Sequence, residues 1–158
     1  MQLHLYNTWH IQAPLETVWA TVVNQQAWPK WWKVVKEVDL LSKGIHYGEK
    51  GYKTKTRLQG FIPYSVTFST EVIVVKPLTY SKGIIRGDLL GNDLWQFSQK
   101  RTNTTVSYTL DITPTVPWMN TFSLFVKPIL FFSHQIFMHE GEKGLSQFLQ
   151  TEHIAHKK

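Results

Sequence analysis

The chain has 158 residues, of which 42% are hydrophobic and 18% charged, and it contains no cysteine. This composition is typical of one folded domain with its own core, and it excludes disulfides, thiolate metal sites and thiol catalysis. The net charge is +6, but the basic residues are dispersed and no recognised nucleic-acid-binding module accompanies them. We therefore expect no nucleic acid among its partners.

The N-terminal segment predicts a strand followed by two short helices. Apolar and polar residues alternate over residues 2–11, which is typical of a half-buried strand. Pro14 suits the first turn of a helix, and apolar residues recur after it at helical spacing. The second short helix is expected to hold Trp28, Trp31 and Trp32, which should plug one end of a hydrophobic interior. The first residues lack the pattern of a secretory signal, so the expected location is cytoplasmic.

Residues 33–114 lose the helical period and predict strands separated by turn signals, such as the turn from Gly60 to Pro63. The six strands are expected at about 33–42, 50–59, 65–76, 79–86, 89–100 and 104–113. Short gaps between consecutive strands indicate hairpins and hence an antiparallel meander. In the last strand apolar and polar residues alternate cleanly, so one face of the sheet should be covered and the other wetter.

The helical period returns after Pro117. Because proline is tolerated in the first turn of a helix and breaks its interior, Pro128 places the main helix at about 128–150 and leaves 151–158 as a frayed tail. The apolar stripe of this helix comprises Phe131, His134, Met138, Leu145 and Phe148. The apolar stretch 117–138 is interrupted by polar residues, which favours a buried helix preceded by an apolar loop over a membrane span.

Together these elements predict a single α+β domain over residues 1–150. A curved antiparallel sheet of seven strands wraps around the long C-terminal helix, and two short helices lie between strands 1 and 2. Because this helix is the only element large enough to cover the apolar face of the sheet, a gap between the two is the expected ligand site.

Three short motifs add a resemblance to a known family. Residues 9–19 (Trp-His-Ile-Gln-Ala-Pro-Leu-Glu-Thr-Val-Trp) place Ala-Pro, a glutamate and Val-Trp after an apolar strand end. With Trp28-Pro29-Lys30-Trp31-Trp32 and the late Gly144-Leu145, the chain resembles the SRPBCC or START-like helix-grip superfamily, in its polyketide cyclase/dehydrase-like branch. The resemblance implies the helix-grip fold. It does not select a function, because the superfamily includes ligand carriers, cyclases, hydrolases, oxygenase domains and a chaperone activator.

The candidate ligand-binding residues come from the inward-type positions of the strands and from the helix stripe. They are Phe68, Arg86, Trp95, Phe97, Tyr108, Leu110, Phe131, His134 and Met138. The aromatic and aliphatic members equally fit plain core packing. Arg86 would anchor an acidic ligand if it faced inward, and solvent exposure is the alternative. The loop from Trp118 to Phe125 is expected to border the entrance.

No complete catalytic or cofactor motif is present. His134 and Glu71 are the candidates for an acid or base, although His134 also fits a core histidine satisfied by the backbone. The histidines lack metal-ligand spacing and the glycines form no phosphate-binding loop, so we expect no metal and no cofactor.

The first functional hypothesis is binding of a small hydrophobic ligand, lipid- or polyketide-like, between sheet and helix. The alternatives are a cyclase, dehydratase or hydrolase acting on an aromatic or polyketide substrate, and a protein- or membrane-interaction module without stable membrane insertion. The basic charge and the segment Trp118–Phe125 motivate the last of these.

Overall fold

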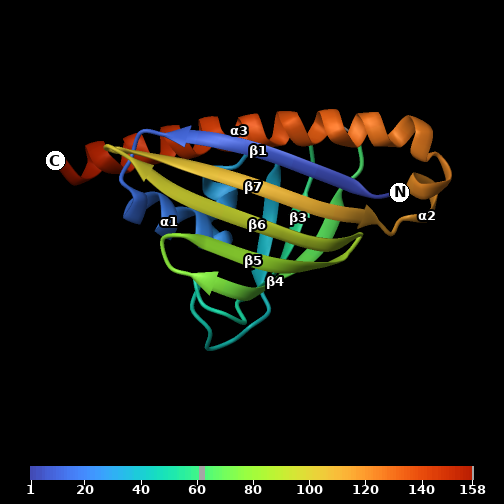
Figure 1. The fold of residues 1–158 in the computed structure, drawn as a ribbon, viewed down its shortest axis with the longest axis horizontal. Coiled ribbons are helices and arrows are strands. Elements are labelled where there is room, and N and C mark those ends of the chain that lie inside the picture. The colour runs from blue at the N-terminus through green and yellow to red at the C-terminus, as the bar shows by residue number, and fades with distance from the viewer. Residues whose placement is uncertain (61–62, 158) are drawn as a thin grey trace.

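The computed structural model describes residues 1–60 and 63–157 (Figure 1). In chain order its elements are β1 (Leu3–Ile11), α1 (Leu15–Val23), the 3₁₀ helix η1 (Gln25–Lys30), β2 (Val35–Leu40), β3 (Lys53–Leu58), β4 (Val66–Lys76), β5 (Tyr80–Gly87), β6 (Leu89–Lys100), β7 (Asn103–Pro114), α2 (Pro117–Thr121) and α3 (Ser123–Lys157). Two residues of the predicted turn at 60–63, numbers 61 and 62, lie outside the described residues. So does residue 158 of the predicted tail.

The strands form one antiparallel sheet in the order β1-β7-β6-β5-β4-β3-β2. Consecutive strands from β2 to β7 are hairpin neighbours, and β1 closes the order by pairing with β7, where Leu5 lies opposite Leu110. The sheet curves around α3, which runs along β1 (Figure 1). This arrangement confirms the predicted α+β helix-grip fold with seven strands.

Two local features accommodate the curvature of the sheet. The pairing of β4 with β5 shifts register between Val72 and Val74, which is a β-bulge. Within β6, Gly91 has φ 155°, and a Cβ atom at this position would lie 1.9 Å from the carbonyl oxygen of Asp111. Only glycine allows the two strands to approach so closely at this point.

The helices differ from the predicted boundaries at three places. η1 ends at Lys30, so Trp31 and Trp32 follow the second helix instead of lying within it. α3 begins before Pro128 and continues through it, although proline gives up the hydrogen bond to the carbonyl four residues earlier. The turn before Pro128 is held against the rest of the fold, because Val126 is buried there. At its other end α3 reaches Lys157, beyond the predicted end near 150.

Five tryptophans fill one end of the space between sheet and helix. This tryptophan cluster consists of Trp9, Trp28, Trp31, Trp32 and Trp95, all buried, with ring centroids 5.2–6.4 Å apart in the pairs that touch. The indole nitrogen of Trp9 donates to the carbonyl of Met138, and that of Trp32 donates to the carbonyl of Phe137, each at 2.8 Å. The cluster therefore plugs this end of the interior and fastens α3 to it.

Two glycines of α3 make this close approach possible. A Cβ atom at Gly141 would lie 2.6 Å from the ring of Trp9, and one at Gly144 would lie 1.8 Å from the carbonyl oxygen of Trp31. Since glycine normally weakens a helix interior, its presence here is explained by packing.

Candidate ligand-binding cavity

Three adjoining compartments lie between the inner face of the sheet and α3. The tryptophan compartment, about 70 Å³, borders Trp28, Trp32 and Trp95. A central compartment of about 90 Å³ follows, and an outer compartment of about 280 Å³ reaches Trp118 of α2. Leu58 and Phe137 line all three, so the compartments form a row from the tryptophan cluster to the opposite end of the fold.

The walls of this row are mostly apolar, and β-strand alternation explains why. Leu3 and Leu5 of β1, Ile85 of β5, and Leu110 and Ile112 of β7 form one buried cluster on the inner face. The walls also include polar groups on neighbouring positions of α3. Ser133 uses its hydroxyl to donate to the carbonyl of Ile129 at 2.7 Å, so it offers little to a ligand.

His134 is a buried polar side chain of the wall whose hydrogen-bonding groups are unused. It is 9% exposed, lines both the tryptophan and the central compartment, and neither of its ring nitrogens has a hydrogen-bond partner among the residues that the structure describes. Burial lowers the pKa of His134 to about 4, so the imidazole is neutral at pH 7. A neutral imidazole can donate through one nitrogen and accept through the other. No backbone group of residues 1–60 or 63–157 pairs with this ring, which contradicts the alternative of a histidine satisfied by the backbone.

Tyr108 of β7 connects His134 with the sheet. Its ring lies nearly parallel to that of His134, with centroids 6.3 Å apart, and packs at 4.1 Å against Trp95. The indole nitrogen of Trp95 is also buried, and within the described part of the chain it has no hydrogen-bond partner. The rings of His134 and Trp95, on either side of Tyr108, thus present unused hydrogen-bonding nitrogens in a mostly apolar wall, where a ligand can pair with them.

Asp93 of β6 lies buried beside Tyr108, whose hydroxyl donates to the Asp93 carboxylate at 3.2 Å. Burial raises the pKa of Asp93 to about 6, and the hydrogen bond from Tyr108 acts in the opposite direction. Burial and the nearby carboxylate raise the pKa of Tyr108 well above its usual value. Gly83 provides the room, because a Cβ atom there would lie 2.7 Å from an Asp93 oxygen.

Sequence reasoning missed Asp93. A signal was present, because Asp93 shares the inward parity of Trp95 and Phe97, where a charged residue is out of place. The large apolar residue Phe137, which touches all three compartments, was missed too, since it lies beside the stripe that the helical spacing suggested.

Most of the residues expected to bind ligand do lie in the cavity wall. They are Phe68, Trp95, Tyr108, Leu110, His134 and Met138. Phe97 is buried elsewhere, since its ring packs at 4.9 Å against Trp19 of α1. Phe131 is 51% exposed and lies at the edge of the inward face of α3, near β1, outside the three compartments.

The two charged candidates point away from the cavity. Arg86 and Glu71 are partly exposed and form an ion pair of 3.7 Å on the outer face of the sheet. The expectation that Arg86 anchors a ligand or that Glu71 acts as an acid or base is therefore wrong for this cavity. Neighbouring side chains of a strand face opposite sides of the sheet. Because Ile85 and Thr70 are buried on the inner face, Arg86 and Glu71 next to them face outward.

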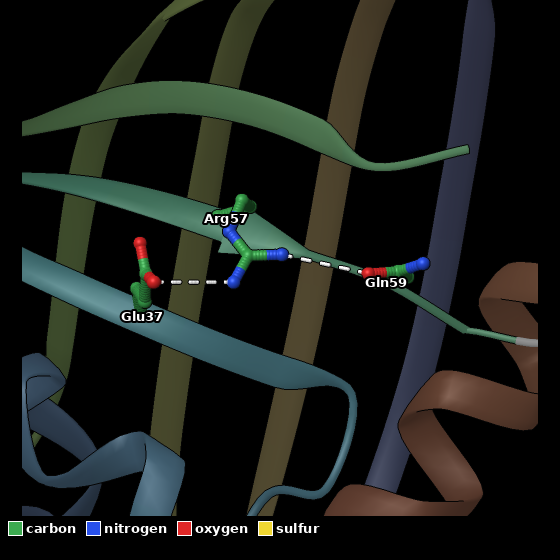
Figure 2. A network of polar contacts seen from close by, with 3 residues as sticks. All are labelled: Glu37, Arg57 and Gln59. Carbon is green, nitrogen blue, oxygen red and sulfur yellow. Dashed lines mark hydrogen bonds and ion pairs between the residues drawn. The ribbon is translucent and has the colours of Figure 1, made fainter. Parts of the chain in front are cut away.

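An exposed polar network on β2 and β3 lies outside the cavity. Arg57 on β3 lies between Glu37 on β2, at 3.2 Å, and Gln59, at 3.5 Å (Figure 2). Exposed pairs of this kind contribute little to stability. Among the residues that the structure describes, no group of acidic residues or histidines is arranged to hold a metal ion.

The segment from Trp118 to Phe125, expected as a loop at the entrance, comprises most of α2 and the first residues of α3. Trp118 and Met119 line the outer compartment, and the ring of Trp118 meets that of Tyr64 edge-on at 5.5 Å. Phe122 and Phe125 are exposed. Although this end of the chain is apolar, none of the described helices is long and apolar enough to cross a membrane.

Comparisons with solved structures show similar folds. A START superfamily protein from Mycobacterium smegmatis has a TM-score of 0.74 at 14% identity, over 94% of this chain and 97% of that one. A Thermus thermophilus protein has a TM-score of 0.71 at 15% identity, over 89% and 95%. An aromatase/cyclase from a Streptomyces species has a TM-score of 0.61 at 13% identity, over 73% and 70%. At these identities the likeness concerns the fold alone.

Comparisons of sequence go further in one respect. None of the curated proteins compared matches this chain. The profile of the family described as polyketide cyclase / dehydrase and lipid transport matches residues 2–130, which include β1 to β7 and the start of α3. The resemblance seen in the motifs of residues 9–19 and 28–32 is thereby confirmed, and the chain belongs to this family.

Proposed function

We propose that this protein binds a small, mainly apolar molecule in the row of compartments between sheet and α3, with His134 as its polar contact. The main observation behind the proposal is that both buried imidazole nitrogens lack a partner among the described residues, in a mostly apolar wall. A buried polar group without a partner costs free energy, and a ligand with a carbonyl or hydroxyl group removes that cost.

The size of the cavity supports a ligand larger than a single ring. An apolar cavity of roughly 150 Å³ already stays dry and accepts a benzene-sized molecule. The outer compartment alone measures about 280 Å³, and the two smaller ones adjoin it. Burial of the ligand's apolar surface, at about 25 cal/mol per Å², supplies most of the affinity, and His134 sets the orientation.

The substitution His134→Phe tests this proposal. Phenylalanine keeps the flat ring and removes both nitrogens, so the fold should persist while binding weakens. The matched control is His139→Phe, on the exposed side of the same helix. Mass spectrometry of molecules released on denaturation should identify a defined compound with wild type and control, and much less of it with His134→Phe. Equal retention by all three proteins would contradict the role of His134. Empty wild-type protein that also fails to bind apolar probes would contradict the proposed function.

A second candidate is proton-transfer catalysis on an aromatic or polyketide-like substrate. The observation that favours it is the row of His134, Tyr108 and Asp93, in which burial shifts the pKa of both the imidazole and the carboxyl group. Shifted groups in a cavity are typical of acid–base sites. The aromatase/cyclase of similar fold is a reason to use polyketide-like compounds as trial substrates. Turnover of such a compound by the wild type and by His139→Phe, but not by His134→Phe, would favour catalysis over ligand binding alone.

A further inference from the structure

One end of the molecule exposes an extensive apolar surface. This apolar tip consists of Trp118, Phe122, Leu124, Phe125, Ile129, Phe131 and Phe132. Leu124 is 82% exposed, Phe125 70% and Phe132 62%. In Figure 1 these residues belong to α2 and to the first turns of α3, at the end of the fold where the N-terminus also lies. Large contiguous apolar surfaces mark sites of interaction.

The first turns of α3 carry large apolar residues on their outward side as well as on their inward side. Val126 packs inward, and Leu130 lines the cavity, while Leu124, Phe125 and Phe132 face outward. A helix with this distribution is normally covered all round, either by protein or by lipid. Its inward side is covered by the sheet, and its outward side is not.

The charge of the tip favours a lipid surface over a second copy of the chain. Between Ile112 and His139 the sequence contains no Asp, Glu or Arg and one Lys, which is the exposed Lys127. In a symmetric dimer through the tip, two copies of Lys127 would approach an apolar interface without an acidic partner from this segment. At an anionic bilayer, Lys127 reaches phosphate groups while its neighbours enter the acyl boundary. The net charge of +6 adds long-range attraction to the same surface.

From these observations we propose that the apolar tip docks this protein onto the surface of an anionic lipid bilayer. The helix lies in the interface and does not span the membrane. Trp118 and Ile129 belong both to the tip and to the wall of the outer compartment, so docking places the bilayer next to the cavity. If the cavity binds an apolar ligand, as proposed above, the ligand exchanges with the bilayer at this end. Docking itself does not depend on that function.

Sedimentation with lipid vesicles tests the proposal. The vesicles contain phosphatidylcholine with phosphatidylglycerol, or phosphatidylcholine alone. The tip variant carries Leu124→Ser, Phe125→Ser and Phe132→Ser. The control replaces three exposed large hydrophobic residues away from the tip, as Tyr6→Ser, Leu41→Ser and Val74→Ser. Wild type and control should bind the anionic vesicles, and the tip variant should bind them roughly tenfold or more weakly, because it loses the contact of three large apolar side chains.

Tryptophan fluorescence adds a readout of position. Trp118 is 43% exposed, and the other six tryptophans are each 8% exposed or less. Brominated lipids should therefore quench the fluorescence of Trp118 in the wild-type protein. The variant Trp118→Phe should still bind the vesicles but should no longer show this quenching. Quenching that persists unchanged in Trp118→Phe would overturn docking through the tip.

Two further results would overturn the proposal. One is that wild type does not bind either vesicle, or that the tip variant binds as well as wild type. The other is that wild type is a dimer in sedimentation velocity, the tip variant is a monomer, and vesicles do not bind, which would assign the surface to a second copy. Ligand retention by the tip variant, measured without vesicles, keeps the two proposals separate, since loss of docking should leave it unchanged.

Discussion

The two buried ionisable groups beside Tyr108 should give stability profiles of opposite slope. Burial raises the pKa of Asp93 from 3.8 to about 6. Between these values the folded protein holds a proton that the unfolded chain releases, so stability falls as the pH rises through this window. The loss amounts to about 3 kcal/mol above pH 6, at 1.36 kcal/mol for each pKa unit.

His134 acts in the other direction. Burial lowers the pKa of His134 from 6.5 to about 4. Between these pH values the imidazole is protonated in the unfolded chain and neutral in the folded protein. Stability is therefore fully present above the unfolded pKa and falls as the pH drops from 6.5 toward 4, again by about 3 kcal/mol. In wild type the two effects overlap and largely cancel, so neither is visible alone.

Single substitutions separate the two groups. Asp93→Asn keeps the acceptor for the Tyr108 hydroxyl and removes the titration, so stability should rise with pH between about 4 and 6.5. His134→Phe should leave a stability that falls over the same window. The double variant should resemble wild type in its slope. Urea unfolding at several pH values, followed by tryptophan fluorescence, measures each free energy of unfolding. Slopes of the same sign in the two single variants, or profiles that match wild type, would refute the assignment.

Two further predictions concern packing and hydrogen bonding. Gly144→Ala should destabilise the fold by about 2 kcal/mol or more, although alanine normally stabilises a helix interior, because its Cβ atom meets the Trp31 carbonyl. Thermal unfolding measures this effect, with Ser146→Ala on the same helix as the control, and a gain in stability at Gly144 would contradict the packing. Tyr108→Phe should raise the pKa of Asp93 further, because the hydroxyl that favours the carboxylate is lost. NMR titration of the Asp93 carboxyl carbon follows the shift, and an unchanged or lower pKa would contradict the hydrogen bond.

Sequence periodicity was sufficient for most of the architecture. Alternation in segments such as 104–113 and the short turns between strands predicted the antiparallel order, because side chains on a strand alternate between faces and short connections permit only hairpins. The tryptophan-rich motif predicted a plugged end of the core, since burying large aromatic surface is strongly favourable. These features depend on local spacing and on residue type.

The predicted orientation of a side chain was wrong where a shift of one residue in a strand, or of part of a turn in a helix, decides which way it points. Arg86 lies beside Ile85, and in a strand that one step separates the outer face from the cavity. Phe131 precedes His134 by less than one turn, which places its ring at the exposed edge of α3. The N-terminal boundary of α3 was misplaced because Pro128 is a local signal against a helix interior, and tertiary packing overrides it.

By itself, the amino-acid sequence determined the fold class, the number of strands, the hairpin pairing of strands β2 to β7, and the aromatic plug, since each follows from local periodicity and from the burial of apolar surface. Only the tertiary structure decided that the His134 nitrogens find no partner in the described part of the chain, that Asp93 pairs with Tyr108, and that apolar side chains at the start of α3 are exposed. Hydrogen-bond satisfaction and solvent exposure depend on which distant segments meet, and that depends on the packing of the whole chain.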